Sequence, residues 1–252
     1  MSLLEAKNLG ITFGGLKAVS GVDFDIKLGE LVGLIGPNGA GKTTFFNLLT
    51  GVYKPTEGEI IFNGKSIAGN SPYQINNLGI ARTFQNIRLF KDLSVLDNVK
   101  IAYNSNMKYN AFEGIFRLPR YFKEEKEANE KAMELLKIFS LDSVCNEKAS
   151  NLPYGKQRKL EIARALASNP KLLLLDEPAA GMNPSETAEL METIAIIREK
   201  FNISILLIEH DMGLVMGICE RLFVLEYGML IASGLPEDVI NNPRVVAAYL
   251  GE

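Results

Sequence analysis

A glycine-rich segment that follows an apolar run constrains the fold of this chain more than any other feature. The segment starts at Gly36 and ends at Thr44, and it reads Gly-Pro-Asn-Gly-Ala-Gly-Lys-Thr-Thr, which matches Gly-x-x-x-x-Gly-Lys-Ser/Thr. It comes directly after the unbroken apolar residues 31–35, and a helical pattern begins where it ends. Glycines let the backbone curl with its N–H groups pointing inward, which suits phosphate groups. The sequence therefore predicts a strand, a phosphate-binding loop and a helix, in that order.

Several groups of this loop are expected to contact a nucleotide. The N–H groups at the start of the following helix favour anions. Lys42 is expected to reach the β- and γ-phosphates, and the hydroxyl of Thr43 is placed to ligate Mg²⁺. A glycine-rich turn that binds nothing is the alternative interpretation, and the strand and helix on either side weigh against it. The expected contacts are Gly36, Asn38, Gly39, Ala40, Gly41, Lys42, Thr43 and Thr44.

Short apolar runs alternate with longer helical patterns, which is typical of βαβ units and a largely parallel sheet. Four runs are apolar apart from Ser204, as expected of strands covered on both faces: 31–35, 172–175, 203–208 and 222–225. Residues 3–9, 22–28 and 59–62 predict a small antiparallel sheet near the N-terminus. We therefore expect an α/β fold with a parallel-sheet core and an N-terminal antiparallel β subdomain. Together with the phosphate-loop motif, this core resembles that of the P-loop NTPases (RecA-like).

The middle of the chain predicts helices. Residues 124–139 repeat apolar positions at helical spacing, and Ser94 followed by Asp97 resembles a capping box that opens another helix. Residues 103–123 have no clean period and are expected to form an irregular loop. We expect a single domain, 1–252, in which 1–84 and 159–252 form the core and 85–158 form an inserted helical subdomain.

Two adjacent carboxylates and the single histidine of the chain follow apolar runs. Asp176 and Glu177 come after residues 172–175, so they are expected at the carboxyl edge of the sheet, where α/β proteins place ligands. Asp176 would hold Mg²⁺, while Glu177 would orient or deprotonate the attacking water. A supporting structural carboxylate is the alternative for Glu177. His210 is expected to contact the γ-phosphate or the water, although a structural role is equally open from spacing alone.

Composition excludes several function classes. The net charge of -3 provides no basic field for nucleic acid, so no nucleic-acid partner is expected. Cys145 and Cys219 lie far apart, which favours buried thiols over a disulfide or a zinc site. The first ten residues lack the regions of a secretory signal, and no apolar run approaches the roughly 20 residues that cross a bilayer. We expect a cytosolic chain that docks onto other subunits if it serves a membrane.

The order of these segments resembles the ATP-binding subunits of ABC transporters over essentially the whole chain. The segments are the phosphate loop, Arg-Thr-Phe-Gln at 82–85, Leu-Pro-Tyr-Gly-Lys-Gln-Arg at 152–158, the carboxylate strand at 172–178 and Glu-His-Asp at 209–211. The resemblance implies that Gln85 contacts Mg²⁺ and the attacking water and senses the membrane subunits. It also implies that Phe13 stacks on adenine, with Val19 nearby. A core role for Phe13 is the alternative.

Two segments depart from the family pattern. The usual signature Leu-Ser-Gly-Gly-Gln is replaced by Leu-Pro-Tyr-Gly-Lys at 152–156, and Pro153 lacks both the hydroxyl and the N–H. Contact with the nucleotide of an opposing subunit is therefore expected from Tyr154, Gly155 and Lys156, unless Lys156 simply faces solvent. Asn183 replaces the usual aspartate but can still cap the following helix. Together with the terminal residues 248–252, these two segments resemble the corresponding segments of the branched-chain amino-acid uptake ATPases.

The resemblance implies an ATP-hydrolysing subunit of an importer for branched-chain amino acids, with ATP and Mg²⁺ as cofactors. Its implied partners are a second ATPase subunit, identical or related, two transmembrane permease subunits and, indirectly, a periplasmic or extracellular solute-binding protein. The chain would bind peripherally to the cytoplasmic face of the plasma membrane. An ATPase of another transporter, such as one for lipopolysaccharide export, or one outside transport is the alternative. The residues alone leave the cargo open.

Overall fold

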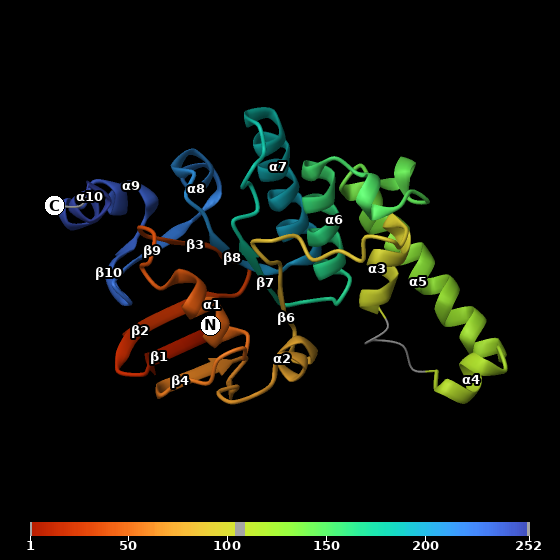
Figure 1. The fold of residues 1–252 in the computed structure, drawn as a ribbon, viewed down its shortest axis with the longest axis horizontal. Helices are drawn as coiled ribbons and strands as arrows, with labels where there is room; N and C mark the ends of the chain where they lie inside the picture. Colours follow the sequence, from red (N-terminus) through yellow and green to blue (C-terminus); the bar gives the residue numbers. More distant parts are fainter. Residues whose placement is uncertain (1, 104–108, 251–252) are drawn as a thin grey trace.

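Two sheets form the framework of the computed structural model, which describes residues 2–103 and 109–250 (Figure 1). All pairings of the larger sheet are parallel except that of β10 with β9. The smaller sheet is antiparallel. The predicted α/β class is confirmed.

The six-stranded sheet has the order β10-β9-β3-β8-β7-β6, comprising β3 (Leu31–Ile35), β6 (Ile80–Arg82), β7 (Leu172–Asp176), β8 (Ser204–Ile208), β9 (Arg221–Glu226) and β10 (Met229–Gly234). The four-stranded sheet has the order β2-β1-β4-β5, comprising β1 (Ser2–Phe13), β2 (Leu16–Lys27), β4 (Glu57–Phe62) and β5 (Lys65–Ser66).

Alternate residues of the parallel strands point into two separate apolar cores. Leu173 and Leu175 of β7 pack in the core that contains α6 (Tyr154–Leu166), α7 (Pro184–Phe201) and α8 (Met212–Ile218). Leu172 and Leu174 pack on the other face with α1 (Lys42–Leu49) and the antiparallel sheet (Figure 1). Successive strand residues face opposite sides of a sheet, so a sheet covered on both sides needs apolar residues at every position. This explains the nearly continuous apolar runs.

The middle of the chain is helical, as predicted. It contains α3 (Val95–Tyr103), α4 (Ala111–Ile115), α5 (Pro119–Ile138) and 3-10 turns at Asp142–Val144 and Ala149–Asn151, while α2 (Pro72–Leu78) precedes β6. The start of α3 is confirmed, because the Ser94 hydroxyl accepts the Asp97 N–H at 3.0 Å. The division expected at 158 falls inside α6, so a continuous helix joins the inserted segment to the core.

The irregular loop expected at 103–123 is wrong over much of its length. Asn110 caps α4 through a reciprocal capping box with Glu113, and Pro119 occupies the first turn of α5. Both features favour a helix start locally, without the long apolar period on which the prediction depended. Residues 104–108 of the expected loop lie outside the described residues.

The cap predicted for α7 is confirmed. The Asn183 side chain accepts the Glu186 N–H at 3.0 Å, and the Glu186 carboxylate accepts the Asn183 N–H at 3.0 Å. We expect Asn183→Ala to lower the free energy of unfolding by about 1 kcal/mol, because it leaves an amide at the helix start unpaired. Urea unfolding measures the change. Asn183→Asp keeps the acceptor oxygen and is the control; an equal loss in both variants would contradict the capping role.

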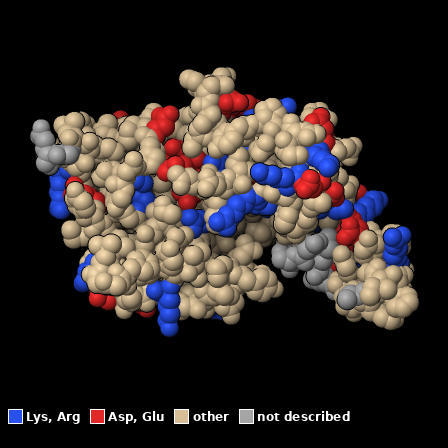
Figure 2. Space-filling model, in the orientation of Figure 1, with Lys and Arg blue, Asp and Glu red and all other residues tan. Residues whose placement is uncertain are grey.

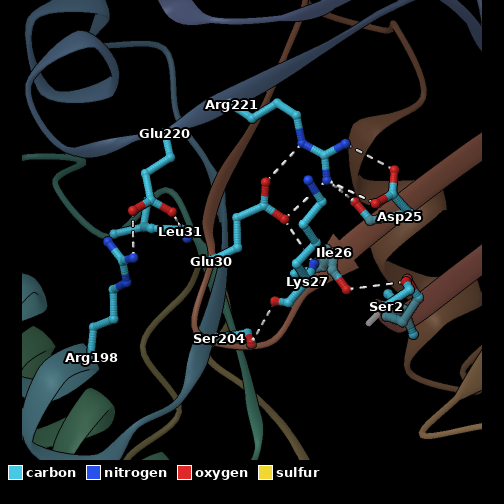
Figure 3. A network of polar contacts seen from close by, with 11 residues as sticks. Ser2, Asp25, Ile26, Lys27, Glu30, Leu31, Arg198, Ser204, Glu220 and Arg221 are labelled. Atoms are coloured by element: carbon cyan, nitrogen blue, oxygen red, sulfur yellow. Dashed lines mark hydrogen bonds and ion pairs between the residues drawn. The ribbon is translucent and has the colours of Figure 1, made fainter.

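A polar network joins the antiparallel sheet to the core sheet (Figure 3). Arg221 at the start of β9 donates to Glu30 at 2.8 Å, and to the two carboxylate oxygens of Asp25 on β2 at 2.9 and 3.0 Å. The hydrogen bonds with Asp25 raise the pKa of Arg221 above its ordinary value. Nearby, Arg198 of α7 donates to Glu220, which precedes β9. The network fixes the smaller sheet and one covering helix to the core sheet.

The surface carries mixed charge, and one of the two cysteines is buried as expected. Figure 2 shows acidic and basic side chains interspersed across the middle of one face. Over residues 2–103 and 109–250, no helix combines the length and the apolar character that a bilayer crossing requires. Cys219 is buried, and burial raises the pKa of its thiol to about 12. Cys145 is only partly buried, so the expectation of two buried thiols is correct for Cys219 alone.

Candidate functional site

The carboxyl ends of four neighbouring strands bring the predicted residues together. Because β3, β8, β7 and β6 are adjacent and parallel, the chain leaves all of them at the same edge of the sheet. The phosphate loop follows β3, His210 follows β8, Glu177 follows β7 and Gln85 follows β6. A pocket of about 440 Å³ lies at this edge. Residues 38–44, Gln85, Glu177 and His210 line it, together with Leu16, Lys17, Ala18 and Tyr227.

The phosphate loop has the backbone conformation that its glycines predict. Gly36, Gly39 and Gly41 have φ angles of 145°, 80° and 99°, which side-chain-bearing residues rarely adopt. A Cβ atom on Gly36 would overlap the Leu225 carbonyl oxygen, and one on Gly41 would lie 2.7 Å from the Ala18 carbonyl oxygen. Both positions therefore require glycine for conformation and for space.

Lys42 is held against the loop that carries it. Its Nζ atom donates to the carbonyl oxygens of Gly36 at 2.6 Å and of Pro37 at 3.0 Å. Burial lowers the pKa of the ammonium, while the carboxylates of Glu177 and Asp176 act in the opposite direction. An ammonium has three protons. The loop carbonyls use two of them, and the third is available to a phosphate oxygen in the pocket.

Glu177 contacts both of the other predicted catalytic residues. Its Oε1 atom lies 2.8 Å from His210 Nε2, and its Oε2 atom accepts a hydrogen bond from Gln85 Nε2 at 2.9 Å. The backbone of Glu177 is left-handed, with φ of 48°, and its N–H donates to the Ile208 carbonyl at 2.9 Å. Three loops thus converge on one carboxylate beside the phosphate loop. A positive φ at a bulky residue is typical of functional sites.

Glu209 is a supporting residue to which the sequence analysis assigned no role. Its carboxylate accepts the N–H of Ala179 at 2.8 Å and that of His210 at 3.1 Å, so it ties the loop after β7 to the loop after β8. Burial raises the pKa of Glu209, and these backbone hydrogen bonds oppose the rise. Asp211, on the other side of His210 in the sequence, caps α8 by accepting the Leu214 N–H at 3.1 Å. Both residues fix the position of His210.

Asp176 does not line the pocket, and Arg82 is its partner. Arg82 Nη2 donates to Asp176 Oδ2 at 2.7 Å, and both side chains are almost fully buried. Arg82 also donates to Asn47 at 2.6 Å, and its guanidinium lies 5.2 Å from the centroid of the Phe84 ring. Arg82 opens the segment Arg-Thr-Phe-Gln, in which the family resemblance implied a role only for Gln85. A cation next to a buried carboxylate becomes visible only once β6 and β7 pair.

The expected magnesium ligands suit that ion by their chemistry. Thr43, Gln85 and Asp176 supply a hydroxyl, an amide oxygen and a carboxylate, and Mg²⁺ prefers oxygen ligands. Across the described parts of the chain, no group of three or more His, Cys, Asp or Glu side chains is placed to hold a metal ion by itself. A magnesium ion that also binds nucleotide phosphates needs only one or two carboxylates. The donor set therefore fits Mg²⁺.

The residues expected around adenine are not among those that line the pocket. Phe13 is 42% exposed and packs edge-on against Tyr53, with ring centroids 5.1 Å apart. It is not among the residues that line the pocket, where Leu16 and Tyr227 provide the exposed apolar surface. The Val19 side chain is buried in the core of the antiparallel sheet. The contacts of Phe13 and Val19 with adenine stay predictions.

The signature residues begin α6 and also lie outside the pocket lining. Tyr154 and Lys156 are exposed, while Gly155 is buried close to the Glu186 carboxylate. Exposure of Lys156 agrees with both alternatives considered for it, namely contact with an anion of another subunit and a solvated side chain.

Arg158, two residues further along α6, connects this helix to the Gln85 loop. It is fully buried and donates to the Phe84 carbonyl at 2.6 Å, to the Gln85 carbonyl at 2.7 Å and to the Glu161 carboxylate at 2.9 Å. Glu161 in turn accepts the N–H of Arg88 at 3.1 Å. The sequence placed Arg158 in a family motif, but nothing in its spacing indicated burial.

Comparison with known families and structures agrees with this geometry. The sequence profile described as ABC transporter matches residues 19–180. The profile described as branched-chain amino acid ATP-binding cassette transporter matches residues 229–252, of which 251 and 252 lie outside the described structure. The ADP conformation of MJ1267, an ATP-binding cassette of an ABC transporter, has a TM-score of 0.86 and 33% identity over all of both chains. A dimeric structure of MJ0796, a bacterial ABC transporter cassette, has a TM-score of 0.78 and 26% identity over 92% of this chain and 98% of the other.

Curated relatives extend over nearly the whole chain. The high-affinity branched-chain amino acid transport ATP-binding protein LivG of Escherichia coli K12 is 48% identical over 99% of this chain and 98% of its own length. BraF of Pseudomonas aeruginosa, which has the same description, is 46% identical over the same shares. The chain therefore belongs to the ABC transporter family, in the group of the branched-chain amino acid transport ATP-binding proteins.

Proposed function

We propose that this chain hydrolyses ATP to power the uptake of branched-chain amino acids through membrane permeases. The observation that carries the hydrolytic role is the contact of Glu177 with both Gln85 and His210 beside the phosphate loop. The position of this carboxylate in the lining of the same pocket as the phosphate loop supports a role in activating water. The choice of cargo is supported by the names of the relatives that match nearly the whole chain.

The side chains divide the work of hydrolysis. Lys42 and the loop N–H groups bind the phosphates and offset their negative charge. Glu177 orients the attacking water and accepts its proton, while Gln85 and His210 hold the carboxylate from both sides. A bound Mg²⁺ would be held by Thr43, Gln85 and Asp176, and it supplies positive charge to the phosphate oxygens.

A second ATPase subunit completes the proposed site. Tyr154, Gly155 and Lys156 begin α6 and are separate from the pocket of their own chain, which suits a contribution to the nucleotide of a partner. The dimeric MJ0796 cassette supports such an arrangement. Binding of ATP would then favour the closed pair of subunits and shift two permeases between outward- and inward-facing states. The permease contact is proposed at residues 85–96, where Arg158 ties the Gln85 loop to α6.

Lys42→Ala should weaken the binding of ATP by roughly 10- to 100-fold, because a charge-assisted contact with phosphate is lost. Equilibrium titration of the purified chain with ATP measures the change. Lys65→Ala serves as the control, since Lys65 is an exposed lysine on β5 that does not line the pocket. Near-normal ATP affinity in Lys42→Ala would contradict the proposed contact of the lysine.

The proposed partners are tested by purifying a tagged chain from its native membranes and identifying the polypeptides that accompany it. We expect two permease subunits, an ATPase subunit and a binding protein for branched-chain amino acids at the cytoplasmic side of a plasma-membrane complex. A lipid-export apparatus in their place would overturn the proposed cargo and leave the ATPase assignment intact.

A further inference from the structure

The last helix of the chain reaches the first residue of the phosphate loop. The N–H of Gly36 donates a hydrogen bond to the Tyr249 hydroxyl at 2.8 Å, over a sequence separation of more than 200 residues. Tyr249 belongs to α10 (Pro243–Leu250) and does not line the nucleotide pocket. The contact thus approaches the loop from outside the pocket.

The peptide groups on both sides of Gly36 are held. On one side, the Gly36 N–H donates to Tyr249. On the other, the Gly36 carbonyl accepts from Lys42 Nζ at 2.6 Å. Gly36 has a φ of 145°, and a Cβ atom at this position would overlap the Leu225 carbonyl oxygen, so no side chain fits. The turn that Tyr249 holds is therefore the one that also orients the lysine of the loop.

Packing fixes the position from which Tyr249 reaches the loop. The helix α9 (Pro236–Ile240) contacts β9 and β10, and α10 contacts β10 and α9 at the end of the molecule where the C-terminus lies (Figure 1). Val239 and Val245 anchor the two helices in the apolar core. Partial burial raises the pKa of the Tyr249 phenol, and the hydrogen bond with Gly36 opposes the rise.

We propose that Tyr249 is a positioning residue of the nucleotide site, which holds the turn at Gly36 in the conformation that binds phosphates. Without the hydroxyl, the Gly36 N–H loses its acceptor, and the turn samples other conformations before the nucleotide binds. ATP then binds only the molecules in which the loop is ordered. The apparent Kd for ATP therefore rises as the ordered fraction falls. The inference rests on the proposed nucleotide site at residues 36–44.

Tyr249→Phe tests the proposal, because it removes one oxygen atom and keeps the ring, which is 42% exposed. We expect the Kd for ATP to rise about 2- to 10-fold, the range for loss of one neutral hydrogen bond. We also expect faster hydrogen exchange in the peptide that contains Gly36, and a melting temperature within a few degrees of the wild type. Tyr73→Phe is the matched control, since Tyr73 is an exposed tyrosine on α2 outside the pocket.

The outcomes separate three cases. If Tyr249→Phe lowers the melting temperature but leaves the Kd for ATP and the exchange at Gly36 unchanged, the residue is purely structural and the proposal is overturned. If Tyr249→Phe matches the wild type in every measurement, the proposal is also overturned, while the nucleotide site stands. If the wild-type chain itself fails to bind ATP, the proposed function fails instead.

Discussion

Glu177→Gln should lower the turnover of ATP by about 10²- to 10⁴-fold and leave ATP affinity close to that of the wild type. Glutamine has the size of glutamate and keeps an oxygen for the Gln85 amide, which lies 2.9 Å from the Glu177 carboxylate. It cannot accept the proton of the attacking water, so the chemical step slows while the phosphate contacts remain. Steady-state phosphate release and equilibrium ATP binding, measured on the same preparation, separate the two effects.

Glu59→Gln is the control for this prediction, because Glu59 is an exposed glutamate on β4, outside the pocket. It should hydrolyse ATP at the wild-type rate. Unchanged turnover in Glu177→Gln would remove Glu177 from the mechanism. Loss of ATP binding in that variant would show instead that the carboxylate supports the shape of the loop.

Arg158→Ala should lower the free energy of unfolding by about 3–5 kcal/mol, the usual cost of leaving one buried charge without its partner. Arg158 and Glu161 are 0% and 2% exposed in their side chains, and their ion pair measures 2.9 Å. The substitution also removes the donors to the carbonyls of Phe84 and Gln85. Urea unfolding followed by circular dichroism measures the loss.

A double-mutant cycle distinguishes the ion pair from simple loss of packing. Combined with Arg158→Ala, Glu161→Gln should cost less than the sum of the two single changes, because no lone buried charge remains. Arg120→Ala provides a surface control. Arg120 is paired with Glu124 but 47% exposed in its side chain, and such pairs contribute at most about 1 kcal/mol. Strict additivity in the cycle would contradict the proposed coupling.

The sequence was sufficient for the parts of this protein that depend on local pattern. Nearly continuous apolar runs identified four core strands, since a strand covered on both faces carries few polar residues. The residues that meet in the pocket, such as Glu177 and His210, were visible because each follows such a run. Local glycine chemistry likewise identified the loop at Gly36.

The strand order was not predictable, because the neighbours β3 and β8 are joined by residues far apart in the chain. For the same reason, Arg82, Arg158 and Tyr249 were given no role. Their partners are Asp176, the Gln85 loop and Gly36, each more than 70 residues away in sequence. β6 has only three residues, too short for a periodic signal. The helices within 103–123 were missed because caps, not periodicity, indicate them.

Uptake of radiolabelled leucine by cells of the native organism tests most directly whether hydrolysis at Glu177 powers branched-chain amino acid import. The cells would carry either the wild-type chain or Glu177→Gln, produced at equal levels, and uptake would be followed at leucine concentrations low enough to require active transport. We expect the Glu177→Gln cells to lose this uptake while import of an unrelated solute is unchanged. Wild-type rates of leucine uptake in these cells would contradict the proposed function.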